Sequence, residues 1–379
     1  MRILTIVGAR PQIIKAAALS RAIRTWFSGQ IEETILHTGQ HYDQNMSQVF
    51  FDELGIPAAD NNLQIGSASH GKQTALMLQG IEAEMEKNRP DFLVLYGDTN
   101  STLAGAIAGA KMRIPIVHIE AGLRSFNKSM PEEINRIMCD HASTLLFVPT
   151  NAGIRNLRNG GFRIEGKAPY SIDNPGVFHS GDIMFDNLLH FSAIAEEKSD
   201  ILSRLQLKDG NFVLCTVHRD NNTDDPERLT AIFSAMQDIS EKHSTRVVIP
   251  LHPRTAKLLP TKLQGGLFEK ISRNGNISII EPVSYLEMIL LEKHCSQILT
   301  DSGGVQKEAY FFKKPLIIAR PETEWVEIVE NGAGIIADAD KERICSAYEY
   351  FTTSSLSFPQ VFGDGNAAKF ICETILQNL

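Results

Sequence analysis

Residues 91–122 have the sequence DFLVLYGDTNSTLAGAIAGAKMRIPIVHIEAG, which decides the fold. Two runs rich in branched apolar residues, 92–98 and 114–122, flank a helical pattern over 100–112. Strands of a parallel sheet are apolar on both faces, because helices cover each side of the sheet. The stretch therefore predicts a strand–helix–strand unit with two parallel strands.

The same alternation continues on both sides of this unit. In the first half we expect further strands at 3–8, 34–39 and 144–150 and helices at 11–27, 43–54, 70–88 and 131–142. In the second half we expect strands at 211–218, 246–253, 277–283, 297–302, 315–320 and 334–339 and helices near 226–242, 284–293, 303–313 and 324–331. Two similar α/β halves predict two Rossmann-like domains with parallel sheets and a ligand cleft between them. Because 159–180 is less periodic, we place the domains at 1–172 and 173–363, followed by a helical tail.

Composition excludes several classes of protein. The chain has 379 residues, of which 43% are hydrophobic and 22% charged, as in a globular protein of two domains. A net charge of −8 without a lysine/arginine block argues against nucleic acid or anionic membrane as a partner. No apolar window reaches the roughly 18 residues of a membrane span, and MRILTIVGARPQ does not resemble a signal peptide. The five scattered cysteines predict reduced core residues in a cytoplasmic protein.

Charged residues follow the strands of the first half. Gly8 leads into Arg10 and, one helical turn later, Lys15, which favours an anion near a helix N-terminus. Acids follow at Asp98, Glu120 and the pair Glu132-Glu133. The competing interpretations are surface cations, a helix cap at Asp98 and dipole partners in the pair. Because Glu120 ends an apolar strand, where a lone carboxylate is costly, we favour acid/base chemistry.

Polar and charged residues also follow the predicted strands of the second half. His218-Arg219 and His252-Arg254 follow successive strands, which indicates an anion site. The competing interpretation is that each strand-end histidine is structural. The strand at 297–302 runs into Ser302-Gly303-Gly304 and then into a helix, which predicts a pyrophosphate cradle, with Glu308 placed to accept bonds from a ribose. A glycine-rich turn that binds no ligand is the competing interpretation. The sequence has no HExxH, no cysteine pair with ligand spacing and no GxSxG, so neither a metal site nor a serine hydrolase is expected.

The chain resembles the non-hydrolysing UDP-N-acetylglucosamine 2-epimerases nearly from end to end. The resemblance is carried by VGARPQIIK (7–15), YGDTNSTLAGA (96–106), HIEAGLRS (118–125), PEEINR (131–136), TVHRDNN (216–222), LTDSGGVQKEA (299–309) and GDG (363–365). It implies glycosyltransferase B architecture, with the C-terminal helix (364–379) crossing back to the first domain, and a homodimer. It also implies epimerisation at C2 by elimination and re-addition of UDP, without a redox cofactor, for a surface polysaccharide such as an O-antigen.

The resemblance also assigns residues. It implies that the catalytic groups are Asp98, Glu120, Glu132 and His218. The substrate-binding residues that it implies are Arg10, Lys15, Arg136, Arg219, His252, Ser302, Gly303, Gly304, Glu308, Arg320 and Glu324, of which the last two line the sugar side.

Two features depart from the acetylglucosamine members of the family. The segment 125–131 is short, and Gly181-Asp182 stands where many members have Gly-Asn. Both are more similar to the branch that acts on UDP-2,3-diacetamido-2,3-dideoxyglucuronate. A glycosyltransferase of the same fold, a hydrolysing epimerase and a non-catalytic UDP-sugar-binding regulator are the competing hypotheses, because fold alone does not fix function.

Overall fold

The chain folds into two compact units in this computed structural model, which describes residues 1–40, 58–251 and 253–378. The first unit comprises Met1–Leu189 and Gln360–Leu379, and the second comprises His190–Pro359. The division lies later than the boundary expected after residue 172. The reason is β7 (Gly176–His179), which is the last strand of the first sheet, so the stretch expected as a linker belongs to the first unit.

The sheet of the first unit is parallel throughout, with the strand order β3-β2-β1-β4-β5-β6-β7. It contains the five strands that the sequence predicts, together with the short strands β3 and β7. The bounds of the first six strands are β1 (Arg2–Val7), β2 (Glu32–His37), β3 (Asn61–Asn62), β4 (Phe92–Tyr96), β5 (Ile116–Ile119) and β6 (Leu145–Val148). β1 lies between β2 and β4, and the sheet extends from it in both directions, as in a Rossmann-like fold.

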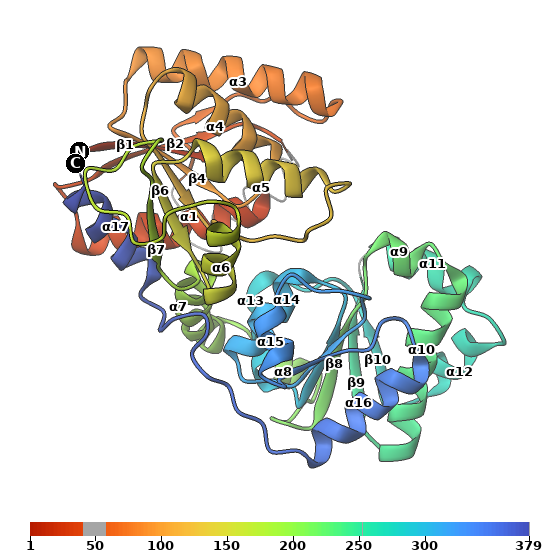
Figure 1. The fold of residues 1–379 in the computed structure, drawn as a ribbon. Helices are drawn as coiled ribbons and strands as arrows, with labels where there is room; N and C mark the ends of the chain where they lie inside the picture. The colour runs from red at the N-terminus through yellow and green to blue at the C-terminus, as the bar shows by residue number, and fades with distance from the viewer. Residues whose placement is uncertain (41–57, 252, 379) are drawn as a thin grey trace. The chain divides into compact units, whose positions relative to one another are not determined.

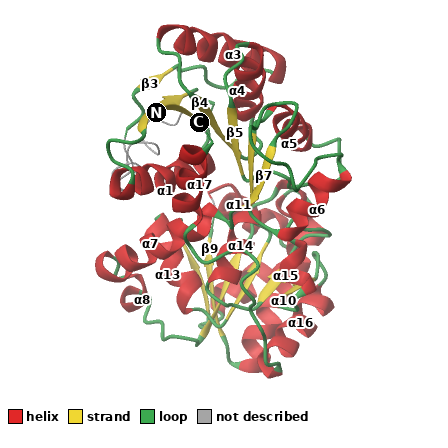
Figure 2. Ribbon diagram, turned by 60° about the vertical axis from the view of Figure 1, so that its left-hand side comes forward, coloured by secondary structure: helices red, strands yellow, loops and turns green. Residues whose placement is uncertain are grey.

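Helices cover both faces of this sheet (Figure 2). They are α1 (Arg10–Trp26), α3 (His70–Lys87), α4 (Asn100–Lys111), α5 (Pro131–Ala142), α6 (Asn151–Asn159) and α17 (Ala367–Gln377), while α7 (Ile183–Lys198) crosses the division between the units. The helix expected at 43–54 lies outside the described residues.

The predicted strand–helix–strand unit forms as β4, α4 and β5 because local signals and packing agree. Thr99 caps α4 by accepting a hydrogen bond from the backbone N–H of Thr102. A Cβ added at Gly105 would lie 2.5 Å from Leu95, and one at Gly109 would lie 2.9 Å from Ile116. Glycine at both positions therefore lets α4 approach the two strands closely, which fixes the residues that follow each strand.

The C-terminal helix α17 packs against α1, although the two helices stand at opposite ends of the sequence (Figure 1). The buried carboxylate of Asp186 on α7 accepts hydrogen bonds from the first two N–H groups of α17, at Ala367 (3.1 Å) and Ala368 (2.9 Å). A carboxylate at a helix N-terminus satisfies donors that have no partner within the helix. This contact holds α17 within the first unit.

The second unit repeats the architecture with the strand order β10-β9-β8-β11-β12-β13, again parallel throughout. All six predicted strands are present. Their bounds are β8 (Phe212–Thr216), β9 (Arg246–Pro250), β10 (Ile277–Ile280), β11 (Gln297–Thr300), β12 (Leu316–Ile318) and β13 (Gly334–Ile336). An apolar core that includes Val213, Phe233 and Ile249 joins this sheet to its helices.

The helices of the second unit include the four that the sequence predicts. They are α8 (Ile201–Arg204), α9 (Asp220–Thr223), α10 (Pro226–His243), α11 (Pro253–Lys262), α12 (Leu267–Arg273), α13 (Tyr285–His294), α14 (Gly303–Phe311), α15 (Val326–Glu330) and α16 (Lys341–Thr353). Asp225 caps α10 through the N–H groups of Glu227 and Arg228. Among the described residues, no helix has the length and apolar character needed to cross a bilayer.

Candidate active site

The register between β4 and β5 brings two predicted catalytic acids to one edge of the first sheet. Tyr96 pairs with Ile119, so that Asp98 and Glu120 follow neighbouring strands within two residues of this pair. Burial raises the pKa of Asp98 above its ordinary value, although the cations of Arg136 and Lys15 partly offset this effect. Asp98 can therefore keep a proton at a higher pH than an exposed aspartate.

Glu120 forms an ion pair with Lys15 of α1, and both side chains are nine-tenths buried. Glu120 has a left-handed backbone with φ +69°, which a residue with a side chain adopts at a cost in free energy. Gly97 is also left-handed, and a Cβ there would lie 3.2 Å from the Glu120 carboxylate and 3.3 Å from the Lys15 ammonium. The two turns are thus shaped to place one carboxylate beside one cation.

A second cation, Arg136 of α5, lies between two carboxylates. Its guanidinium contacts Asp98 at 2.5 Å and Glu133 at 3.1 Å. Burial opposes ionisation of Glu133, but the N–H groups of Ser125 (2.8 Å) and Phe126 (3.1 Å) and the charge of Arg136 outweigh it and lower the pKa. Glu133 therefore fixes the loop before α5, whereas its neighbour Glu132 is exposed.

An open pocket of about 840 Å³ lies at this edge of the sheet. Its lining includes three of the predicted residues, Arg10, Asp98 and Glu132. The remaining lining residues are Ala9, Pro11, Gln40, Ser67, Ala68, His70, Gln73, Thr99, Asn100, Pro131 and Asn135. Acids and a cation that share one pocket can bind an anionic substrate and exchange a proton with it.

In the second unit, the register between β8 and β11 sets His218 beside Asp301. Thr216 pairs with Thr300, and the buried Asp301 carboxylate accepts hydrogen bonds from the N–H groups of His218 (3.1 Å) and Arg219 (3.1 Å) and from the amide of Asn222 (3.0 Å). The imidazole Nδ1 of His218 lies 3.3 Å from the same carboxylate, while 41% of the side chain is exposed. Asp301 thus fixes the loop that carries the predicted His-Arg pair.

The Ser302-Gly303-Gly304 turn leads directly into α14, as the sequence predicts. Trp325 donates its indole N–H to the Gly303 carbonyl at 3.0 Å, and the Lys307 ammonium lies 4.3 Å from the centroid of that indole. Among the described residues outside the turn and the adjoining backbone of α14, no atom would lie closer than 3.8 Å to a Cβ added at Gly303 or Gly304, so the backbone of the turn is open to approach. N–H groups at a helix N-terminus attract phosphate oxygens.

Arg320 and Glu324 lie beside this turn and bond each other. Two parallel hydrogen bonds of 3.1 Å and 3.0 Å join the guanidinium to the carboxylate. Such a bidentate pair holds both side chains in one plane. The predicted binding residue His252 lies outside the described residues.

Comparison with known proteins identifies the family. The family described as UDP-N-acetylglucosamine 2-epimerase matches residues 27–376, which is most of the chain.

The chain belongs to the UDP-N-acetylglucosamine 2-epimerase family. It is 48% identical over 380 residues to a UDP-N-acetylglucosamine 2-epimerase homolog of Methanococcus maripaludis, covering 100% of both chains. It is 46% identical to the UDP-2,3-diacetamido-2,3-dideoxy-D-glucuronate 2-epimerase of Pseudomonas aeruginosa, covering 98% of this chain and 99% of that one. Its structure matches that of Methanocaldococcus jannaschii UDP-GlcNAc 2-epimerase in complex with UDP-GlcNAc and UDP, with TM-score 0.83, 39% identity and 100% coverage of both chains.

This membership confirms the predicted fold class of two Rossmann-like α/β domains in glycosyltransferase B architecture, since the solved relatives match the chain over its full length. Within each unit, the structure gathers the predicted residues that it describes at the carboxyl edge of one sheet. Arg10, Lys15 and Arg136 join the three acids in the first unit. In the parts of the chain that the structure covers, no cluster of His, Cys, Asp or Glu is arranged to hold a metal ion.

The sequence analysis did not predict a buried hydrogen-bond network next to Asp98 and Glu120. His118 contacts Asp140 (2.8 Å) through Nδ1 and the Gly97 carbonyl (2.8 Å) through Nε2, and Arg124 contacts Asp140 at 2.7 Å. Burial lowers the pKa of His118, but Cys139 and the Asp140 carboxylate together outweigh this and raise the pKa well above the ordinary value. Burial raises the pKa of Asp140, but His118 and Arg124 outweigh it and lower the pKa. The network ties the turn before Asp98 to the strand that ends at Glu120.

Proposed function

We propose that the protein is a non-hydrolysing epimerase that converts UDP-N-acetylglucosamine to UDP-N-acetylmannosamine by inverting C2. The observation that carries this proposal is the edge of the first sheet, where Asp98 and Glu120 lie with the cations Lys15 and Arg136. Epimerisation needs one group that removes a proton and one that returns it, and it needs positive charge near the departing anion.

The proposed reaction conserves atoms and electrons without a redox partner. A carboxylate takes the C2 proton, the C2–H electron pair becomes a C1=C2 double bond, and the C1–O bond breaks with its electrons passing to the β-phosphate of UDP. Return of a proton to the opposite face of C2 and re-addition of UDP at C1 give the inverted sugar. We propose Asp98, Glu120 and Glu132 as the acid/base groups and His218 as the fourth catalytic group.

Binding of UDP is proposed at the edge of the second sheet. The open Gly303-Gly304 backbone and the N-terminus of α14 suit the pyrophosphate, and the carboxylate of Glu308 suits the ribose hydroxyls. The further binding residues that we propose are Arg10, Lys15, Arg136, Arg219, His252, Ser302, Arg320 and Glu324. The solved relative in complex with UDP-GlcNAc and UDP supports this proposal through its full-length match.

Replacing Ser302 or Glu308 by alanine should lower the affinity for UDP about tenfold or more, because a hydrogen bond to a charged group contributes about 1.5–3 kcal/mol. Isothermal titration of UDP into each variant measures the effect. Ser355→Ala, in the loop after α16 and away from the strand ends, is the matched control and should bind UDP normally. Unchanged affinity in both test variants would remove these residues from the UDP site.

We further propose that the enzyme works as a cytoplasmic homodimer that supplies a surface polysaccharide such as an O-antigen. The resemblance to the epimerase family supports the homodimer and the pathway. The five free cysteines, four of them buried, support a reducing compartment. Light scattering of the purified chain tests the dimer directly.

Product analysis tests the proposed function against its competitors. The chain is incubated without acceptor, in separate reactions, with UDP-N-acetylglucosamine and with UDP-2,3-diacetamido-2,3-dideoxyglucuronate. We expect UDP-N-acetylmannosamine from the first. Turnover of the uronate alone would show that the enzyme performs the same reaction on that sugar. Net release of UDP with free N-acetylmannosamine would indicate a hydrolysing enzyme. No reaction without acceptor would favour a glycosyltransferase or a binding protein.

A further inference from the structure

Among the described residues of the second unit, the buried carboxyl group of Glu292 has no hydrogen-bond partner. Glu292 of α13 has 0% of its surface exposed, and neither of its carboxyl oxygens has a hydrogen-bond partner among the described residues. Burial of an unpaired polar group costs free energy, so such a group in a packed core needs an explanation. The epimerase mechanism proposed above makes no use of Glu292.

The position of Glu292 on α13 offers an explanation for its burial. Tyr285, Ile289 and Glu292 stand four and three residues apart on α13 and are all buried, so they lie on one face of the helix. This helix packs against α14, and the Tyr285 hydroxyl donates to the Glu308 carboxylate at 3.4 Å. The face of α13 that carries Glu292 is therefore the face that meets Glu308.

The two carboxyl groups interact electrostatically across the helix pair. Burial and, next, the nearby Glu308 raise the pKa of Glu292 well above the ordinary value. The raised pKa favours the protonated form of Glu292, which has an O–H group to donate, whereas an ionised carboxylate only accepts. Glu292 thus offers a donor to a neighbouring acceptor.

We propose that Glu292 is a positioning residue for UDP binding, whose carboxyl group donates a hydrogen bond that orients Glu308 toward the ribose hydroxyls. The proposal rests on the proposed function, because Glu308 is the ribose-binding residue there. Tyr285 donates to the Glu308 carboxylate from the side of α13, and the proposed bond from Glu292 adds a second restraint from the same side. A carboxylate has enough acceptor sites to bond the ribose as well. An acceptor held in place by two donors loses less entropy when it binds a ligand.

Stability and binding should respond to substitution of Glu292 in opposite directions. Leucine at this position removes a polar group from the core, so Glu292→Leu should keep or raise the melting temperature of the full chain. The same variant removes the donor, so its UDP affinity should fall about fivefold. Glu292→Gln keeps a donor in its amide and should bind UDP within about twofold of the wild type. A purely structural role predicts that affinity and melting temperature fall together.

The experiment titrates UDP and 2′,3′-dideoxy-UDP into the wild-type chain, Glu292→Leu, Glu292→Gln and the control Glu330→Gln, which alters a carboxylate at the end of α15. We expect the leucine variant to lose affinity for UDP but not for the dideoxy analogue, which has no hydroxyls for Glu308. Equal loss with both nucleotides, no loss with either, or a melting temperature reduced in both variants would overturn the proposal. If the wild-type chain binds no UDP, the proposed function fails and this inference fails with it. If the wild-type chain binds UDP and the leucine variant binds it equally well, this inference alone fails.

Discussion

Each of the substitutions Asp98→Asn, Glu120→Gln and Glu132→Gln should lower the rate of epimerisation about 10²–10⁴-fold, the usual cost of removing a general acid or base. The amides keep the size of the side chains and remove their basicity. The structure gives the three acids different surroundings, since Asp98 bonds Arg136, Glu120 bonds Lys15 and Glu132 is exposed at the pocket. The measurement is the initial rate of formation of the manno epimer by each variant.

The fold supplies two controls for this prediction. Binding of UDP should persist in all three variants, because the proposed cradle belongs to the other unit, His190–Pro359. Glu86→Gln changes an exposed acid of α3 in the same unit and should leave the rate unchanged. Near wild-type rates in all three test variants would show that these acids are only helix caps and ion-pair partners.

Asp140→Ala should lower the free energy of unfolding by about 3–5 kcal/mol, because it leaves buried positive charge without its partner. Asp140 and His118 are both fully buried, and Arg124 is nine-tenths buried. For a unit of this size, the melting temperature should fall by about 10 °C. Differential scanning calorimetry measures the effect, and Asp173→Ala, which removes an exposed acid of the same unit, should have almost none.

The pH dependence of this effect distinguishes the ionic network from simple packing. The raised pKa of His118 means that its contribution is complete below the ordinary histidine value of about 6.5 and is lost as pH rises through the folded value. The lowered pKa of Asp140 means that its contribution is present above about 3.9 and is lost on further acidification. The melting difference between wild type and Asp140→Ala should therefore be larger near pH 5.5 than near pH 8.5. A difference that does not change with pH would contradict a charged network.

Strand–helix alternation was enough to predict most of both sheets, because strands such as β4 and β8 are apolar or buried at every position and stand out from their flanking helices. The strands β3 and β7 were missed for a different reason. β3 consists of two exposed residues, and β7 has only four residues in a stretch rich in glycine and proline. Both strands therefore depend on pairing with β2 and β6 rather than on their own sequence pattern. That dependence also moved the division of the chain to residue 189.

The sequence also predicted which residues lie at the carboxyl edge of each sheet, because residues that follow parallel strands meet there. The sequence did not separate the roles of Glu132 and Glu133. Neighbouring helical positions point about 100° apart, and only the loop geometry shows that Glu133 bonds Ser125 while Glu132 lines the pocket. His118 and Asp140 form a pair across 22 residues that has no local signal. Glu292 looks like an ordinary helix residue until its burial is known.

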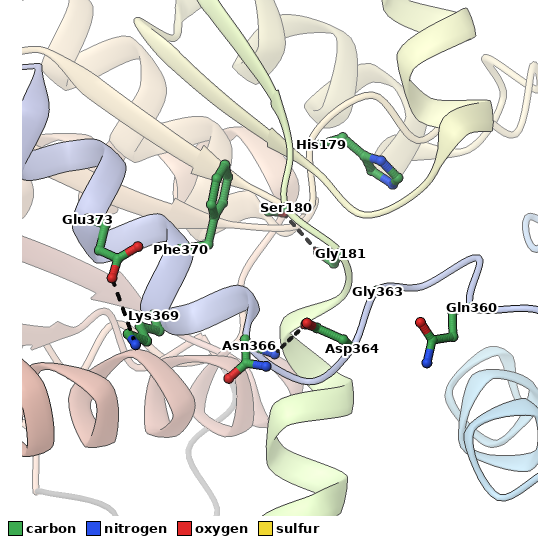
Figure 3. A pocket seen from close by; sticks show the side chains of 10 residues that line it. All are labelled: His179, Ser180, Gly181, Gln360, Gly363, Asp364, Asn366, Lys369, Phe370 and Glu373. Atoms are coloured by element: carbon green, nitrogen blue, oxygen red, sulfur yellow. Dashed lines mark hydrogen bonds and ion pairs between the residues drawn. The ribbon is translucent and has the colours of Figure 1, made fainter.

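The first unit has a second cavity, lined by residues of 179–181 and 360–373 (Figure 3). It has a volume of about 660 Å³, and the side chains of His179, Asp364, Lys369 and Glu373 are among its lining. Lys369 and Glu373 form an exposed pair with an ammonium–carboxylate distance of 4.0 Å, and Asp364 accepts from the N–H of Asn366. The Lys369–Glu373 pair is largely exposed, whereas the side chains of Lys15, Glu120 and Arg136 beside Asp98 are nine-tenths buried. The pocket at β4 and β5 therefore fits the proposed catalytic role better than this cavity does.

The fate of the C2 hydrogen of UDP-N-acetylglucosamine during turnover in deuterated water, without acceptor, tests the proposed epimerisation. Mass spectrometry and proton NMR of the recovered nucleotide sugar follow this atom. The proposed mechanism predicts one solvent deuterium at C2 in an equilibrating mixture of the gluco and manno epimers, both still linked to UDP. A manno epimer that retains its original hydrogen, or free sugar that accumulates together with UDP, would contradict it.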